Sequence, residues 1–151
     1  MSPGASARNG ANASTEPGVA AVADLVGDKW SMLLVRALFR GIHRFDDLQA
    51  DLGISRAILA ARLKELNQAG IVDKIPYQQR PTRYEYVLTP MGVELSPALV
   101  ALVRWGNRYF GDADHRTVLV HAPCDTEFEQ GFWCETCQTT FGPPAIKARR
   151  D

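Results

Sequence analysis

The residue types best suited to specific chemistry lie near the end of the chain. His121 and Cys124 form an H-x2-C pair, and Cys134 and Cys137 form a C-x2-C pair. Two pairs at this spacing can hold one tetrahedral ion from two turns, with three thiolates and one imidazole as the ligands of a structural zinc site. Three alternatives remain open: a redox dithiol of Cys134 and Cys137, a disulfide between Cys124 and one of them, and inert thiols. The odd number of cysteines weighs against a framework made only of disulfides.

No enzyme motif accompanies these residues. The chain has neither a nucleophile elbow nor a glycine loop that cradles phosphate, and Asp46, Asp47 and Asp51 have the spacing of a solvated helix face. Thiol–disulfide exchange through Cys134 and Cys137 is the one enzymatic alternative, and the pair lacks the βαβ context of such enzymes. We therefore expect a protein without enzymatic activity.

A second group of candidate residues surrounds a predicted helix, Ser55–Gln68. Leu59, Leu63 and Leu66 recur at helical spacing and predict one buried stripe, so that small and cationic residues form the opposite face. Such a face fits the major groove of DNA, although alanine and lysine also commonly fill a solvated face. The helix residues expected to contact DNA are Ser55, Arg56, Ala57, Ala60, Ala61, Arg62 and Lys64.

The elements around this helix predict how it is presented. A short helix over Phe45–Leu52 and a turn at residues 53–54 precede it, and alternating β-branched and aromatic residues between Ile71 and Leu88 predict a hairpin after it. Residues 78–82 form the predicted polar tip, where Arg80, Pro81 and Arg83 are expected to approach the DNA backbone or minor groove. The order of elements is that of a winged helix-turn-helix, whose usual ligand is double-stranded DNA.

Net charge does not oppose this interpretation. Lys and Arg number 17 and Asp and Glu also number 17, which gives a formal net charge of zero. Residues 53–90, however, carry more basic than acidic side chains. A positive field on one face is sufficient for nucleic-acid binding.

Together these motifs identify a family resemblance. From Gly27 to about Gly106 the chain resembles the HxlR-type winged-helix transcriptional regulators of bacteria and archaea. The residues that carry the resemblance are Gly27-Asp28-Lys29-Trp30, Phe45, Gly53-Ile54-Ser55, Leu59, Arg62-Leu63-Lys64-Glu65-Leu66, Gly70, Pro81, Tyr86, Leu88-Thr89, Gly92 and Trp105-Gly106. The resemblance implies a cytoplasmic, homodimeric DNA-binding regulator that needs no cofactor to bind DNA.

The chain departs from the family pattern in two places. Many members carry a redox-sensing cysteine before the first helix, and this chain has no cysteine before Cys124. That switch is therefore not carried over. Ala60 stands where the family commonly has a small hydroxyl residue.

Flanking segments predict the assembly. Val19–Val26, Asp28–Arg40 and Pro90–Phe110, the last bent near Pro97, are more apolar than one packed face requires. We expect them to form a homodimer, with completion of a monomer core as the alternative. The expected dimer contacts are Val22, Leu25, Trp30, Leu99, Leu102, Trp105 and Tyr109. A pocket beside Trp30 or Trp105 would suit a small-molecule effector.

The predicted fold class is α+β and mostly helical. We expect a disordered tail over residues 1–17, a winged helix-turn-helix domain with dimerisation helices over 18–111, and an extension over 112–151 that carries the possible zinc or redox motif. No apolar run approaches the roughly 20 residues of a membrane span, which favours the cytoplasm. The expected partners are DNA, a second copy and a small-molecule or redox effector, with a winged helix used only for protein contacts as the alternative. His43 and His115 are expected at the surface.

Overall fold

The structure, a computed structural model, describes residues 17–112, 117–127 and 131–147. The chain forms two compact units, Met1–Ser96 and Pro97–Asp151, and the division falls inside the segment 18–111 that the sequence predicts as one domain. Apart from Pro17, the predicted N-terminal tail lies outside the described residues, and so does His115.

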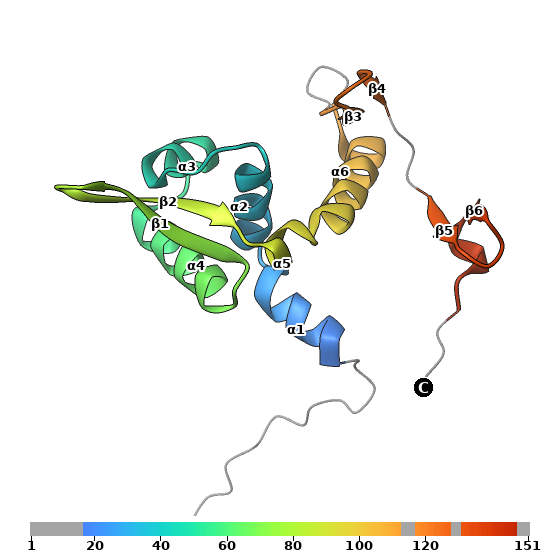
Figure 1. The fold of residues 1–151 in the computed structure, drawn as a ribbon, viewed down its shortest axis with the longest axis horizontal. Helices are drawn as coiled ribbons and strands as arrows, with labels where there is room; N and C mark the ends of the chain where they lie inside the picture. The colour runs from blue at the N-terminus through green and yellow to red at the C-terminus, as the bar shows by residue number, and fades with distance from the viewer. Residues whose placement is uncertain (1–16, 113–116, 128–130, 148–151) are drawn as a thin grey trace, which may run out of the picture. The chain divides into compact units, whose positions relative to one another are not determined.

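The first unit is a winged helix-turn-helix (Figure 1). Its helices cover the base of a two-stranded antiparallel sheet whose far end projects beyond α3 and α4. The elements, in chain order, are α1 (Pro17–Val26), α2 (Lys29–Phe39), α3 (Phe45–Leu52), α4 (Arg56–Gln68), β1 (Val72–Gln79), β2 (Thr82–Leu88) and α5 (Pro90–Val93). The predicted fold class is confirmed.

The core of this unit joins α2, α3 and α4 to the start of β1. Leu34, Leu48, Leu59, Leu66 and Val72 are among the side chains that are fully buried there. Burying one such side chain contributes about 1.5–3 kcal/mol relative to leaving it exposed. These contacts fix the orientation of α4, because its leucine stripe faces the core.

Local hydrogen bonds define both ends of α4. The Ile58 amide donates to Ser55 Oγ at 3.3 Å, which confirms Ser55 as the N-cap. Beyond the last turn, Gly70 has φ +76°, a left-handed conformation that favours glycine. The Ile71 amide then donates to the Leu66 carbonyl at 2.9 Å, and the Gly70 amide to the Asn67 carbonyl at 3.0 Å, as in a Schellman motif.

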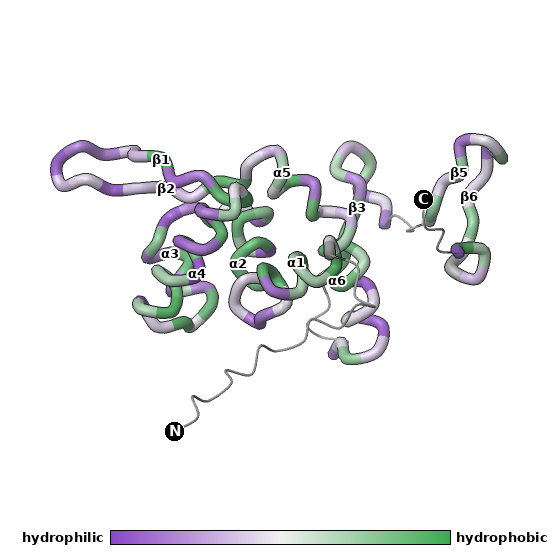
Figure 2. The backbone as a smooth tube through the Cα atoms, turned by 90° about the horizontal axis from the view of Figure 1, so that it is seen from below, coloured by the Kyte–Doolittle hydropathy of each residue, from purple (hydrophilic) through white to green (hydrophobic). Residues whose placement is uncertain are grey.

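The hairpin tip is shorter than predicted. Strand pairing continues to Gln79 opposite Thr82, so the tip is only Arg80 and Pro81, which are joined by a cis peptide bond. The prediction of a five-residue tip over 78–82 is wrong, because the outer part of this hairpin lies beyond the core. Polar side chains can continue the ladder there without facing a buried surface (Figure 2, hydrophilic end of β1 and β2).

The base of the hairpin is tied to the segment before α3. The Tyr86 amide donates to the His43 carbonyl at 2.8 Å, and His43 Nδ1 lies 3.0 Å from the Tyr86 carbonyl oxygen. A carbonyl accepts only, so Nδ1 carries the proton in this contact. His43 is half-buried and has a partner, which corrects its assignment as a surface residue.

The described residues of the second unit form one α-helix and two small hairpins. They are α6 (Ser96–Phe110), β3 (Val120–His121) with β4 (Thr126–Glu127), and β5 (Phe132–Cys134) with β6 (Thr139–Phe141), followed by a 3-10 turn, Pro143–Ala145. The predicted segment Pro90–Phe110 is thus interrupted at residues 94–95, and Pro97 lies in the first turn of α6. Within the described part of this unit no side chain is buried. None of the described helices of the chain has the length and hydropathy that a membrane span requires.

Candidate nucleic-acid interface

The outer face of α4 has the composition and exposure that contact with a groove requires. Ala57, Ala60, Ala61 and Lys64 are all exposed, opposite the buried leucine stripe. Three methyl side chains let another surface approach the helix backbone closely, and Lys64 adds a cation beside them. The sequence pattern missed Ile58 on this helix, which is 41% exposed and can make apolar contacts.

Arg56, at the start of α4, is held by α3. Its Nη1 donates to Asp46 Oδ1 at 2.8 Å and to Gln49 Oε1 at 3.1 Å, and its guanidinium lies 4.8 Å from the Phe45 ring centre. Both partners of the ion pair are largely exposed. Exposed ion pairs contribute at most about 1 kcal/mol, so a phosphate can replace this carboxylate at little cost.

Arg62 instead connects α4 to the start of α2. Its Nε lies 3.5 Å from Asp28 Oδ1, and its Nη1 pairs with Glu65. Asp28 caps α2 through the amides of Trp30 at 2.9 Å and Ser31 at 3.2 Å. Arg62 therefore helps to position α4 against the start of α2.

The charges around Arg62 support this role. Burial alone would raise the pKa of Asp28, but hydrogen bonds from Ser31 and Trp30 together with the Arg62 guanidinium hold that pKa below its usual value. The hydrogen bond with Glu65, and then the charge of Asp28, raise the pKa of Arg62. Both groups are ionised at neutral pH.

The wing, which is the hairpin of β1 and β2, presents cations that have no acidic partner among the described residues. Arg80 and Arg83 are exposed and form no ion pair with any described carboxylate. The tip is held by Gln78 Nε2, which donates to the Arg80 carbonyl at 3.1 Å, and by Thr82 Oγ1, which donates to the Gln79 carbonyl at 3.1 Å. The sequence-predicted wing residues Arg80, Pro81 and Arg83 thus lie together at the end of β1 and β2.

A hollow of about 490 Å³ lies between the start of α3 and the wing, and sequence reasoning missed it. Arg44, Arg56 and Arg83 line it together with Tyr77 and Tyr84. The Arg44 guanidinium stacks 4.7 Å from the Tyr77 ring centre and its Nε lies 3.2 Å from Glu85 Oε1. Hydrogen bonding to Glu85, and then the Tyr77 side chain, raise the pKa of Arg44. Asp46 and Asp47 line the same hollow, so it brings cations and carboxylates together and is not a purely cationic site.

Comparison with known proteins identifies the family of the chain. The family model described as HxlR-like helix-turn-helix matches residues 25–114, a span from the end of α1 through α6. The chain belongs to the HxlR-like family. The predicted resemblance is confirmed.

Individual relatives agree with the family. An uncharacterised HTH-type transcriptional regulator of Mycobacterium tuberculosis is 36% identical over 115 residues, which cover 76% of this chain and 73% of the relative. Among solved structures, the candidate transcription factor PA1607 matches with a TM-score of 0.79 and 34% identity, covering 93% of this chain and 97% of that one. The redox regulator HypR in its reduced form matches with a TM-score of 0.57 and 33% identity, covering 61% of this chain and 94% of that one. The protein is thus a helix-turn-helix transcriptional regulator, a class of regulators and not of enzymes.

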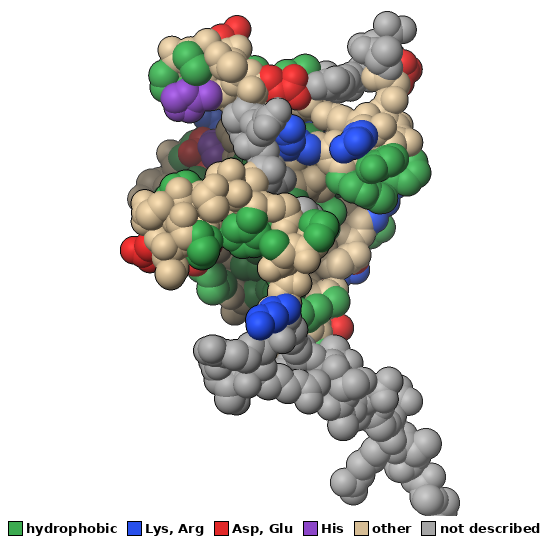
Figure 3. Space-filling view, turned by 90° about the vertical axis from the view of Figure 1, so that its right-hand side faces the viewer, with side chains coloured by type: hydrophobic (Ala, Val, Ile, Leu, Met, Phe, Trp, Pro, Cys, Tyr) green, Lys and Arg blue, Asp and Glu red, His purple; other side chains and the backbone are tan. Residues whose placement is uncertain are grey.

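The HxlR-like chain exposes apolar side chains on α1 and α6. Figure 3 shows hydrophobic side chains exposed on one face of the molecule. Val22 on α1 is 51% exposed, and Leu102, Trp105 and Tyr109 on α6 are 48%, 56% and 60% exposed. The other predicted dimer residues are less accessible. Leu25 and Trp30 pack against the core of the first unit, and Leu99 is half-buried.

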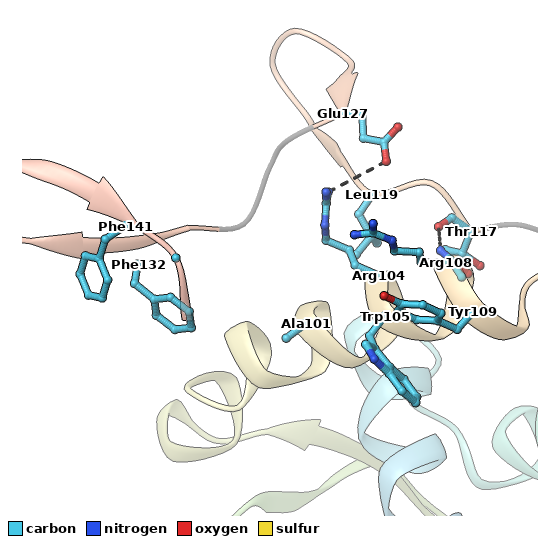
Figure 4. A pocket seen from close by; sticks show the side chains of 12 residues that line it. Ala101, Arg104, Trp105, Arg108, Tyr109, Thr117, Leu119, Glu127, Phe132 and Phe141 are labelled. Atoms are coloured by element: carbon cyan, nitrogen blue, oxygen red, sulfur yellow. Dashed lines mark hydrogen bonds and ion pairs between the residues drawn. The ribbon is translucent and has the colours of Figure 1, made fainter. Parts of the chain in front are cut away.

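A shallow hollow of about 630 Å³ lies beside Trp105 in the second unit (Figure 4). Arg104, Arg108 and Tyr109 also line it, and Arg104 Nη1 lies 4.0 Å from Glu127 Oε1. The sequence suggests an effector pocket beside Trp30 or beside Trp105, and this hollow lies beside Trp105. Trp30 does not line it.

The predicted metal ligands lie in the tail, residues 112–151, as two separate pairs. His121 Nδ1 lies 3.2 Å from Cys124 Sγ, and all three cysteines are free thiols. No three potential ligands gather at one point within the part of the chain that the structure describes. Hydrogen bonds from the backbone and thiol of Cys137 lower the pKa of Cys134, and hydrogen bonds from Thr126 lower that of Cys124.

Proposed function

We propose that this HxlR-like regulator binds double-stranded DNA sequence-specifically as a homodimer, with α4 in the major groove and the β1–β2 hairpin against the backbone or minor groove. The observation that carries the proposal is the exposed face of Ala57, Ala60, Ala61 and Lys64 on a helix whose opposite side is locked into the core. A helix can read base edges only if its outer side chains let it approach them.

We assign the cations at the hairpin tip and at the start of α4 to contacts with phosphate. Arg80 and Arg83 stand at the far end of the hairpin and have no described acidic partner, so they can bind phosphate without breaking an existing pair. Arg56 can exchange Asp46 for a phosphate at the helix start. Phosphate contacts set the register of the protein on the duplex, and contacts from α4 supply sequence preference.

Exposed apolar residues on α1 and α6 support the homodimer. A helix-turn-helix regulator that acts as a dimer reads two half-sites, with recognition helices about 34 Å apart along the DNA axis. Side chains as apolar as Leu102 and Trp105 are uncommon on a face that stays in water, and a second copy of the chain would cover them.

DNA titration tests the proposal. Purified protein is mixed with sheared genomic DNA and the bound fragments are sequenced, which yields the half-site sequence and spacing together. The recovered site is then titrated against a scrambled duplex at several salt concentrations. We expect preferential binding to the recovered site and affinity that falls steeply with salt. Absence of any binding at low salt would instead favour a winged helix that contacts only proteins.

A further inference from the structure

The two hairpins of the tail are built to the same plan. His121 pairs with Thr126 across β3 and β4, and Cys134 pairs with Thr139 across β5 and β6. In each hairpin the next cysteine, Cys124 or Cys137, is the third residue of the connecting turn.

The backbone repeats as well as the residue types. The residue after each of these cysteines has a positive φ, +54° at Asp125 and +52° at Gln138, although neither is glycine. These two are the only non-glycine residues with positive φ among those described. Two turns that share ligand positions, strand register and an uncommon backbone angle indicate one function served by both.

We propose that the two turns together bind one Zn²⁺ ion in a tetrahedral site made by His121, Cys124, Cys134 and Cys137 of the same chain. Coordination would form one Zn–N and three Zn–S bonds and release three thiol protons to solvent. Four protein ligands complete the coordination of zinc, so the site would be structural.

The geometry of the first pair fits this ion. With Zn–S near 2.3 Å and Zn–N near 2.0 Å, the sulfur and nitrogen ligands of a tetrahedral site lie about 3.5 Å apart. His121 Nδ1 and Cys124 Sγ are 3.2 Å apart, so a shift of a few tenths of an ångström is sufficient.

The two hairpins of the tail have few contacts of their own to stabilise them. The strands of the two hairpins are two and three residues long, and none of their side chains is buried. An isolated two-stranded hairpin is only marginally stable in water, and small elements without a core commonly depend on a cross-link. A disulfide between Cys134 and Cys137 would leave His121 and Cys124 without a role, whereas one zinc ion joins both hairpins.

Metal binding requires the hairpins to approach each other. They are separated by the short segment between Glu127 and Phe132, and a chain of that length keeps the end of β4 and the start of β5 within about 20 Å of each other. The tail can therefore bring the four ligands together without any change in the winged helix.

Metal content of the full-length protein tests the proposal, in the absence of DNA, so the result does not depend on DNA binding. Reduced, metal-free protein is titrated with Zn²⁺ against a colorimetric chelator, and metal is quantified by plasma mass spectrometry. We expect about one zinc per chain, and loss of that zinc in both Cys124→Ser and Cys134→Ser. Asp125→Asn and Glu135→Gln, in the same two turns, are the matched controls and should retain zinc.

Substitution with Co²⁺ provides a second measurement. Tetrahedral cobalt bound to thiolates absorbs strongly in the visible range, and the absorbance should disappear on addition of one equivalent of zinc. Zinc that survives Cys124→Ser would overturn the joint site, because the second turn would then suffice. Failure of the reduced protein to take up zinc, or a disulfide between Cys134 and Cys137 that forms and reduces reversibly in zinc-containing buffer, would overturn the proposal in favour of inert thiols or a redox dithiol.

Discussion

At the scale of single residues, the cations of the interface differ in what holds them in the free protein. Arg62 is paired with Asp28 and Glu65, whereas Arg80 and Arg83 have no partner among the described carboxylates. A paired arginine fixes the position of an element, and an unpaired one is available to phosphate. Substitutions at these positions should therefore have different consequences.

Arg80→Ala and Arg83→Ala are expected to weaken binding to every DNA sequence. Each should reduce the slope of log affinity against log salt by somewhat less than one unit for each lost phosphate contact. Ala60→Leu should instead cost about 1–3 kcal/mol on the recovered site and leave scrambled DNA nearly unaffected. Fluorescence anisotropy with both duplexes at several salt concentrations measures the difference. Equal losses on both duplexes for all three variants would show that α4 is only a scaffold.

Asp28 is expected to stabilise the first unit in a pH-dependent way. Asp28→Ala removes the N-cap of α2 and leaves Arg62 without one partner, so the free energy of unfolding should fall by about 1 kcal/mol or more. The folded-state pKa of Asp28 lies below the unfolded value of 3.8, so its charge stabilises the fold above that pH and this contribution is lost as pH falls through the folded pKa.

Asp28→Asn separates the two effects, because asparagine also caps helices but carries no charge. Urea denaturation at about pH 7 and about pH 3 should show a larger difference between Asp28→Asn and the unsubstituted protein at the higher pH. A difference that does not change with pH would mean that the carboxylate charge contributes nothing beyond the cap.

At the scale of elements, local spacing determined most of what the sequence could predict. The bounds of α3, the Ser55 cap and the Gly70 end of α4 all depend on residues a few positions apart, and these predictions are confirmed. The hairpin tip was placed wrongly because the polarity of Gln78, Gln79 and Thr82 resembles that of a loop.

Contacts between distant residues were not predictable in this way. Arg44 and Tyr77 stack across two different elements, and the partner of His43 is the backbone of Tyr86. The two residues of each pair are far apart in the sequence, so no local pattern predicts that they are in contact. Zinc binding by the tail likewise requires two separate turns to approach each other, which no local spacing predicts. Zinc binding therefore remains a prediction.

Close packing of α5 on the segment between α4 and β1 predicts the effect of Gly92→Ala. A Cβ at Gly92 would lie 2.2 Å from the Ile71 carbonyl oxygen, a backbone atom that cannot move aside alone. We expect a loss of about 1–3 kcal/mol in the free energy of unfolding. Gly18→Ala is the control, since no atom lies within 4 Å of its new Cβ. Denaturant unfolding compares the two, and equal stability of both variants would mean that α5 does not pack as described.

At the scale of the whole molecule, the proposed homodimer depends on the apolar side chains that α6 leaves exposed. Leu102, Trp105 and Tyr109 recur at helical spacing along α6, and Trp105 lies 5.6 Å from Tyr109 and 5.1 Å from Phe110 between ring centres. Aromatic side chains gathered on one exposed helix face are typical of protein interfaces. A dimer of the chain would carry two copies of α4, one for each of two half-sites.

Leu102→Lys tests this assembly against a closely matched control. Val118 is 48% exposed, as is Leu102, but it lies outside α1 and α6. A lysine within an apolar interface leaves a charge to be desolvated, so Leu102→Lys should raise the dimer dissociation constant about tenfold or more, whereas Val118→Lys should leave it unchanged. Analytical ultracentrifugation measures both, and circular dichroism confirms that each variant is folded. If the unsubstituted protein stays monomeric at micromolar concentrations, each winged helix would bind DNA independently. If both lysine variants dimerise equally well, the protein is a dimer but this face of α6 does not form its interface.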